Sequence, residues 1–201
     1  NHNHKGFSVF FDDDVLWVGT ANGINKGIID GDCISWTHYT VEEGLSGNWV
    51  IGINEGLDYL WAITWSTSST ENIGLSYSYD NGETWQYVDF FTDRGIKVYS
   101  IDSSKDQIYA STIEGLYVSN DGEYWELLSS NFFDDDSGQE IFSDMVYCSY
   151  FNGDANQLWI GTGEGLVVYS LDDYNEDITQ FYAESTFSAF PNPCYIKNNL
   201  V

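Results

Sequence analysis

Carboxylates are the most abundant chemically active side chains of this 201-residue chain, which has 32 Asp and Glu residues. Two runs are dense, Asp12–Asp14 and Asp134–Asp136. Carboxylate oxygens are hard ligands that suit Ca²⁺, but neither run has the alternating spacing of a calcium-binding loop. We therefore expect solvated turns, the first in a hairpin and the second between two structural units. No cofactor is expected, with Ca²⁺ left open as the one ion that these acidic runs could bind.

The same abundance makes paired carboxylates a weak sign of catalysis. A glycosidase needs two carboxylates about 5 or about 6.5–9.5 Å apart, and among so many acids some pair will meet that spacing. The sequence holds no Ser/His/Asp or Cys/His nucleophile motif, P-loop or dinucleotide fingerprint. The glycine-rich segment 161–165 is expected in a hairpin, where it cannot hold a phosphate at a helix N-terminus. The sequence therefore favours a protein without catalytic activity over an enzyme.

Histidine and cysteine indicate little metal chemistry. His2 and His4 could bind a metal, or belong to a flexible terminal loop before the first strand. Cys33, Cys148 and Cys194 are too few for a disulfide framework, and their spacing does not suit zinc. We expect the cysteines to be small apolar residues at partly buried sites.

Charge excludes several classes of partner. The formal net charge is −26, with only six Lys and Arg residues, so nucleic acid and anionic membrane surfaces are disfavoured. The chain contains no run of about 18 apolar residues, the length that could span a bilayer. Aromatic residues make up 17% of the chain and supply the buried area that folding needs. With no initiator Met and no signal peptide, we expect a processed product or part of a longer protein.

A repeat in the sequence predicts the strands that must position these residues. Segments that begin aliphatic–aromatic and end in Thr start at residues 16, 60, 108 and 158, a period of 44 to 50 residues. A glycine–aliphatic pair follows each one: Gly23-Ile24, Gly74-Leu75, Gly115-Leu116 and Gly165-Leu166. This period fits one four-stranded blade of a β-propeller.

Each repeat is expected to hold four strands, A to D. Strand A covers the apolar runs 7–11, 49–53, 96–101 and 145–150, strand B the aromatic segment, and strand C starts at the glycine, which permits a turn with positive φ. Strand D starts near Trp36, Trp85, Trp125 and Phe181. The prediction is an all-β chain of four four-stranded antiparallel blades, 1–43, 44–91, 92–136 and 137–184, with a linker or a following domain at 185–201.

The pattern Leu-Trp-x-Gly-Thr-x-x-Gly-aliphatic, at 16–24 and 158–166, resembles the propeller repeat of bacterial two-component regulator sensors. That resemblance implies a periplasmic or extracellular propeller, often sevenfold, and a response to glycans. Four blades would then be part of a larger ring, completed by further blades of the same or another chain.

A second resemblance is to the Asp-box, Ser-x-Asp-x-Gly-x-Thr-Trp, of sialidase-like propellers, which residues 78–85 match. Residues 120–125 resemble a degenerate copy that lacks the Ser and the first Asp. In that family the box is a structural turn between strands C and D, formed here by Ser78, Asp80, Gly82 and Trp85, with Gly122 and Trp125 in the second copy. Sialidase activity needs three arginines to hold a carboxylate, and this chain has one, Arg94.

The tail breaks the pattern. Both prolines of the chain lie in the segment Ala189-Phe190-Pro191-Asn192-Pro193-Cys194. It resembles the opening of a small immunoglobulin-like or sorting domain that follows secreted propellers. A plain C-terminal linker is the other interpretation.

Propeller geometry predicts where a ligand would bind. The D–A and B–C loops emerge at one end of the blades, and loops carry function while blades position them. The Ser- and Thr-rich loop after Trp65 suits a sugar ring, with the indole against its apolar face. The candidate ligand-binding residues of this loop face are His4, Asn22, Asn48, Trp65, Arg94, Glu114, Asp144 and Glu164.

The sequence therefore predicts a non-catalytic, extracellular or periplasmic module that binds a glycan or a protein, or serves as a scaffold. One alternative is an Asp-box propeller glycoside hydrolase acting on a polysaccharide. Another is a structural subunit of a cell-surface assembly.

Overall fold

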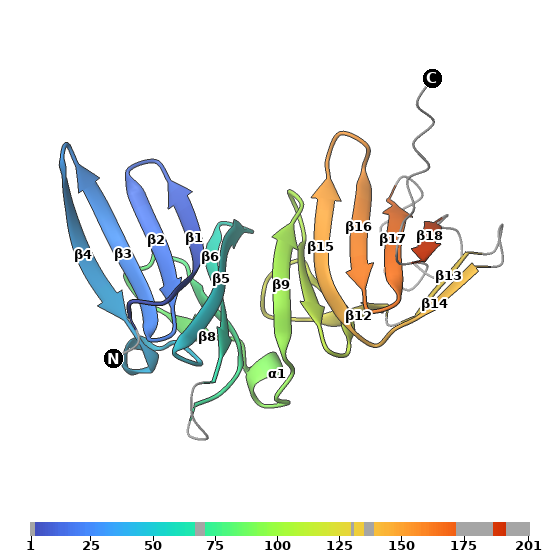
Figure 1. Ribbon diagram of the computed structural model, residues 1–201, viewed down its shortest axis with the longest axis horizontal. Coiled ribbons are helices and arrows are strands. Elements are labelled where there is room, and N and C mark those ends of the chain that lie inside the picture. The colour runs from blue at the N-terminus through green and yellow to red at the C-terminus, as the bar shows by residue number, and fades with distance from the viewer. Residues whose placement is uncertain (1–2, 67–70, 130, 135–138, 172–186, 192–201) are drawn as a thin grey trace.

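The computed structural model describes residues 3–66, 71–129, 131–134, 139–171 and 187–191. In these residues the chain is almost entirely β, with four four-stranded antiparallel sheets, one two-stranded hairpin and two short helical turns. Figure 1 shows the four sheets side by side in chain order. The predicted fold class, an all-β chain of four four-stranded blades, is confirmed.

The strands of each blade follow one another in the sequence. The first blade has β1 (Gly6–Asp12), β2 (Val15–Thr20), β3 (Gly23–Asp30) and β4 (Cys33–Tyr39). The second has β5 (Trp49–Gly56), β6 (Tyr59–Trp65), β7 (Gly74–Ser78) and β8 (Gln86–Tyr87). The third has β9 (Val98–Ser103), β10 (Ile108–Thr112), β11 (Gly115–Ser119) and β12 (Glu126–Ser129). The fourth has β15 (Val146–Asn152), β16 (Gln157–Thr162), β17 (Gly165–Ser170) and β18 (Phe187–Pro191).

Three further elements lie between the blades. The 3₁₀ turn η1 (Val41–Glu43) leads into the second blade, and α1 (Asp89–Thr92) leads into the third. The hairpin of β13 (Asn131–Asp134) and β14 (Gln139–Phe142) separates the third blade from the fourth. Every described blade-to-blade connection thus carries more structure than a simple loop.

The repeated threonine and glycine close the turn between the second and third strands. The threonine hydroxyl at the end of each second strand donates to the carbonyl of the glycine that opens the third, at O···O distances from 2.8 to 3.3 Å. The φ angles of Gly23, Gly74 and Gly115 are 100°, 150° and 129°, so the predicted positive φ is confirmed at these three turns. The threonine and glycine that repeat in the sequence therefore stabilise the hairpin turn between the second and third strands.

The apolar core lies between the blades. One cluster of buried residues joins the first and second blades, one the second and third, and one the third and fourth. The first strands contact one another in series, β1 with β5, β5 with β9 and β9 with β15. A single twisted sheet cannot cover both of its faces, so each blade depends on its neighbours for burial.

The aromatic residues of the second strands occupy equivalent positions. Trp17, Trp61, Tyr109 and Trp159 each pair with the first strand on one side and the third strand on the other. The first three are buried, whereas Trp159 is 37% exposed. The difference follows from position, because the next blade in the series covers each buried ring and the fourth blade is the last one described.

The fourth strand of the last blade is placed differently from the prediction. We expected it near Phe181, which lies outside the described residues, and a linker or new domain from residue 185. The structure instead pairs β18 with β17, from Tyr169↔Phe187 to Gly165↔Pro191. Pro191 at the end of this pairing is compatible with the outermost strand of a sheet, where one side of the backbone needs no partner.

No helix in the described part of the chain is long and apolar enough to cross a membrane.

Candidate functional site

Five aromatic side chains form a continuous row across all four blades. Neighbouring ring centroids are 5.4 Å apart for Phe7–Trp49, 5.5 Å for Trp49–Trp65, 6.0 Å for Trp65–Tyr99 and 5.2 Å for Tyr99–Tyr147. The rings meet edge to face or tilted, the arrangement that aromatic quadrupoles favour. We call this set the aromatic row.

Strand direction explains why these residues meet. Phe7, Trp49, Tyr99 and Tyr147 lie near the starts of the first strands, and Trp65 is the last residue of a second strand. Because the two strands are antiparallel, those positions share the end of the blades from which the D–A and B–C loops emerge. The row therefore runs along the innermost strands at the predicted loop face.

The aromatic row is open to solvent at both ends. Phe7 is 46% exposed and Tyr147 45%, while the three rings between them are partly buried. The hydroxyl of Tyr147 lies 3.8 Å from the sulfur of Met145, which is itself exposed. A ligand therefore has access to the rings at the ends of the row and only partial access to the rings between them.

Lys97 places a positive charge on the row. Its Nζ lies 3.5 Å from the centroid of the Trp65 ring and 5.6 Å from that of Tyr99. The indole N–H of Trp65 donates to the carbonyl of Val98 at 2.9 Å, which holds the ring in place. One face of Trp65 is therefore occupied by an ammonium, so a sugar cannot use that face as we expected from the sequence.

Two predicted residues gather in a second cluster between the second and third blades. The guanidinium of Arg94 lies 4.3 Å from the Phe90 ring, and Glu114 accepts a hydrogen bond from the Tyr117 hydroxyl at 3.3 Å. The rings of Phe90 and Tyr117 are 5.3 Å apart. Burial raises the pKa of Tyr117, as does the nearby Glu114 carboxylate, while Arg94 opposes them.

Asn48 and Asn22 are tied into local structure. Asn48 donates to Glu71 Oε1 at 2.7 Å and accepts from the backbone N–H of Val41 at 3.1 Å. The carbonyl of Asn22 lies 2.5 Å from His38 Nε2. Both residues therefore already contact other parts of the protein.

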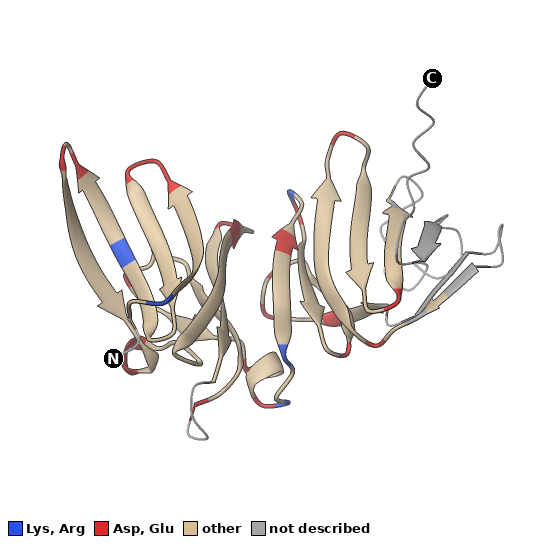
Figure 2. Cartoon of the chain, in the orientation of Figure 1, with Lys and Arg blue, Asp and Glu red and all other residues tan. Residues whose placement is uncertain are grey.

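His4, Asp144 and Glu164 are exposed. His4 lies before β1, whereas Asp144, before β15, and Glu164, between β16 and β17, lie in adjacent loops of the fourth blade. The Gly163 N–H joins these two loops by hydrogen bonds to the Met145 carbonyl and the Ser143 hydroxyl. In the described residues, no three His, Cys, Asp or Glu side chains gather to hold a metal ion. Figure 2 shows that, in the described part of the chain, most acidic residues lie in the turns and loops at the two ends of the blades.

The turn from Ser78 to Trp85 is tightly hydrogen-bonded. The Asp80 carboxylate accepts from the Ser78 hydroxyl at 2.8 Å, the Thr84 N–H at 2.9 Å and the Thr84 hydroxyl at 2.6 Å. Although burial raises the pKa of Asp80, the bonds from Thr84 and Ser78 bring it down to about 2. The turn thus depends on an ionised carboxylate.

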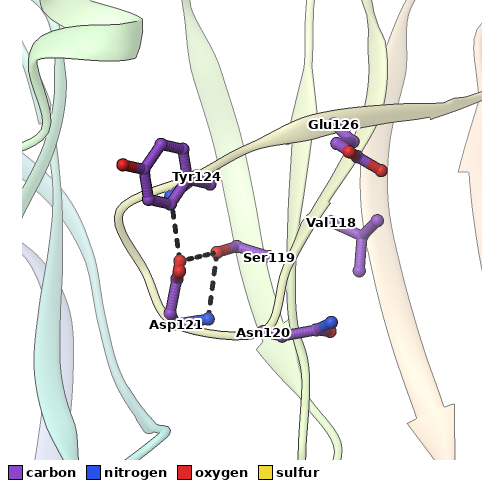
Figure 3. Close-up of a pocket in the computed structure, with 6 residues that line it drawn as sticks. All are labelled: Val118, Ser119, Asn120, Asp121, Tyr124 and Glu126. Carbon is purple, nitrogen blue, oxygen red and sulfur yellow. Dashed lines mark hydrogen bonds between the residues drawn. The ribbon is translucent and has the colours of Figure 1, made fainter. Parts of the chain in front are cut away.

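The second copy of this turn is more complete than we expected. Ser119 donates to Asp121 Oδ1 at 3.1 Å, and that oxygen also accepts from the N–H of Tyr124 at 2.9 Å (Figure 3). The N–H of Gly122 donates to the Ser119 hydroxyl at 2.8 Å, as Gly82 does to Ser78 at 2.7 Å. The expectation that the Ser and first Asp are missing was wrong, because the turn is one residue shorter and the motif is displaced by that residue.

Sequence reasoning named only Trp65 of the aromatic row. Phe7, Trp49, Tyr99 and Tyr147 are ordinary apolar strand residues when considered one at a time. Their common place near the start of strand A was a usable signal, since aligned repeats put aligned residues at one end of the ring.

No family model matches this chain, and no curated protein matches its sequence. Solved structures do match. An ancestral GH74 enzyme has a TM-score of 0.60 at 16% identity, over 94% of this chain and 26% of that one. PorZ, an essential surface component of the type-IX secretion system of Porphyromonas gingivalis, has a TM-score of 0.56 at 15% identity, over 90% and 26%.

The extracellular domain of a putative hybrid two-component system from B. thetaiotaomicron matches at 19% identity with a TM-score of 0.47, over 96% of this chain and 29% of that one. This chain thus spans between a quarter and a third of the length of these three structures. At such identities the likeness to the GH74 enzyme and to PorZ establishes the fold alone. The chain has a β-propeller fold.

Proposed function

We propose that this chain is part of an extracellular or periplasmic β-propeller that binds a glycan at the aromatic row without catalysing a reaction. The aromatic row is the observation that carries this proposal. It joins all four blades at the end where propeller loops converge, and its terminal rings, Phe7 and Tyr147, are close to half exposed.

The chemistry of the row suits a sugar chain. Aromatic rings present apolar surface to the C–H face of a sugar, and Tyr hydroxyls offer both a donor and an acceptor to its hydroxyl groups. Lys97 adds an ammonium with three donors in the middle of the row. We expect the sugar to contact the exposed rings of Phe7 and Tyr147, because Lys97 covers one face of Trp65.

Glycan-array binding tests the proposal. Tyr147→Ala removes an exposed ring of the row and is expected to weaken binding about tenfold, the effect of losing one stacked ring at ~1–1.5 kcal/mol. Trp36→Ala is the matched control, because Trp36 is 51% exposed but lies on the last strand of the first blade. An array with no bound glycan, or equal losses of affinity in the two variants, would contradict the proposal. If the chain bound proteins but no glycan, the ligand would be a protein.

A second candidate is a subunit of a surface assembly whose ring is completed by further blades. The outer face of the first blade supports it, because Val9, Phe11, Ile34 and Trp36 are 68%, 57%, 43% and 51% exposed. PorZ, with which this chain shares its fold, is a bacterial surface component. Native mass measurement tests this candidate, which predicts a complex that Trp36→Glu dissociates.

The glycoside hydrolase alternative has the fold of the GH74 enzyme in its favour. It predicts turnover of a polysaccharide, detected as new reducing ends. Turnover that carboxylate substitutions abolish would overturn the non-catalytic proposal.

A further inference from the structure

A buried lysine bridges the first and second blades. Lys26 Nζ lies 5.1 Å from the centroid of the Trp17 ring, with the side chain 6% exposed. It donates to the carbonyl of Asn81 at 2.7 Å and to Glu83 Oε1 at 2.6 Å. The ammonium is therefore held between an indole of one blade and the turn of the next, by a cation–π contact and two charge-assisted hydrogen bonds.

The second and third blades repeat this interface. Trp61 occupies the position of Trp17, and Gly122 lies against it as Gly82 lies against Trp17. A Cβ on Gly122 would come within 2.8 Å of Trp61 Cη2. The segment Asp121-Gly122-Glu123 takes the place of Asn81-Gly82-Glu83, so a carboxylate again follows the glycine that touches the indole.

The lysine itself is not repeated. Trp17 pairs with Lys26 across β2 and β3, whereas Trp61 pairs with Tyr77 across β6 and β7. The Tyr77 hydroxyl donates to Gln86 Oε1 on β8 at 3.0 Å and makes no hydrogen bond to Glu123 in the described structure. Within the part of the chain that the structure describes, the Glu123 carboxylate has no hydrogen bond or ion pair.

A pocket of about 230 Å³ occupies this place. Three of the rings that line it, Tyr59, Trp61 and Tyr77, lie with each pair of centroids 5.6 Å apart, and Asp121 and Glu123 also line it. Liquid water takes up ~30 Å³ per molecule, so the pocket has room for several waters or for a short alkylammonium in their place. Burial raises the pKa of Tyr77, as does the negative charge of Glu123.

We propose that this pocket, the Trp61 pocket, binds the protonated amine of a lysine side chain from a basic partner protein. The ammonium would sit against the aromatic rings and pair with Glu123, as Lys26 sits against Trp17 and pairs with Glu83. The charge of the whole chain supports this class of partner, since 32 acidic and 6 basic residues attract cations over long range. The pocket lies at the turn end of the blades, away from the aromatic row, so the proposal is independent of the proposed function.

A titration with n-butylammonium tests the proposal, followed by the NMR signal of the Trp61 indole N–H, which Trp61→Phe identifies. We expect saturable shifts at Trp61 and none from 1-butanol, a neutral molecule of similar shape. Glu123→Gln is expected to weaken n-butylammonium binding about tenfold, because the amide oxygen still accepts a hydrogen bond but the carboxylate charge that strengthens it is lost. Glu83→Gln removes the same net charge, but its carboxylate already holds Lys26, so binding is expected to stay unchanged.

Tyr77→Lys is a second variant that supplies the missing ammonium from the chain itself. It is expected to abolish n-butylammonium binding, with the backbone amide spectrum preserved as evidence of folding. Equal weakening by Glu123→Gln and Glu83→Gln would show general charge attraction and overturn the proposal, as would unchanged binding in Tyr77→Lys. A comparison of Nα-acetyl-lysine methylamide, whose ε-amine is free, with glucosamine separates a protein source from an amino sugar, and tighter binding of glucosamine would overturn the lysine assignment.

Discussion

The indole of Trp61 meets the indole of Trp125 edge to face across two blades, with ring centroids 6.1 Å apart and planes at 88°. Trp17 and Trp85 make the same contact one interface earlier, at 6.1 Å and 81°. In both cases the first ring belongs to the second strand of one blade and the other follows the C–D turn of the next. This pair, with the glycine of the turn packed on the first ring, joins the first blade to the second and the second to the third.

The closeness of Gly82 to Trp17 predicts a large cost for a single methyl group. Gly82 has a φ of 74°, and a Cβ there would overlap the Trp17 ring. We expect Gly82→Ala to lower the free energy of unfolding by about 3 kcal/mol, from backbone strain and overpacking together. Gly95→Ala is the control, because Gly95 has a φ of 65° but open space around it, and should cost about 1 kcal/mol. Chemical denaturation measures both, and equal costs would show that contact with Trp17 is unimportant.

The threonine at the end of each second strand is expected to stabilise its hairpin. In the third blade Thr112 Oγ1 donates to the Gly115 carbonyl at 2.8 Å and accepts from the Glu114 N–H at 3.1 Å. Thr112→Val leaves both backbone groups without this partner and should cost about 1–3 kcal/mol in thermal or chemical unfolding. Thr92→Val is matched to it, because the buried Thr92 hydroxyl has no hydrogen-bond partner in the described structure. A Thr92→Val cost as large as that of Thr112→Val would argue against the hairpin bonds.

Equivalent tryptophans are expected to differ in their contribution to stability. Trp61 is 1% exposed and Trp159 is 37% exposed, although both occupy the same place in their blades. Trp61→Ala should cost about 3–5 kcal/mol, the range for a large buried ring. Trp159→Ala should cost only ~1–2 kcal/mol, because less apolar area leaves water on folding. Equal costs in urea titrations would mean that another part of the protein covers Trp159.

The carboxylate of Asp80 predicts a loss of stability in acid. Its pKa is about 2 in the folded protein, below the value of about 3.9 for an unperturbed Asp. A lowered folded-state pKa gives stability that is present above the unfolded pKa and is lost as the pH falls through the folded pKa. Wild type should therefore exceed Asp80→Asn in unfolding free energy near neutral pH, with the difference shrinking between about pH 4 and about pH 2. A difference that does not change with pH would contradict this assignment.

Much of the fold could be predicted because its signals are local. Strand order, the place of the second strands and the positive φ of Gly23, Gly74 and Gly115 follow from a repeat of about 44 to 50 residues with a glycine in a fixed place. The last strand could not be located in this way, because nothing near Phe181 distinguishes it from the later segment that pairs with β17.

The candidate sites depend on distances between blades. The aromatic row needs side chains from separate first strands to meet, and the Trp61 pocket needs Glu123 of the third blade to face Tyr77 of the second. Trp65 was predicted for its type and its loop, but its contact with Lys97 was not, since Lys97 is 32 residues further along the chain.

The sequence by itself determined the all-β repeat, because hairpin turns and strands depend on the types of residues that are close together in the chain. Only the tertiary structure decided that Phe7, Trp49, Trp65, Tyr99 and Tyr147 form one surface, and that Lys26 has no counterpart beside Trp61. The physical reason is that both features depend on contacts between side chains of neighbouring blades. Such residues are far apart in the chain, and no local pattern records which of them touch.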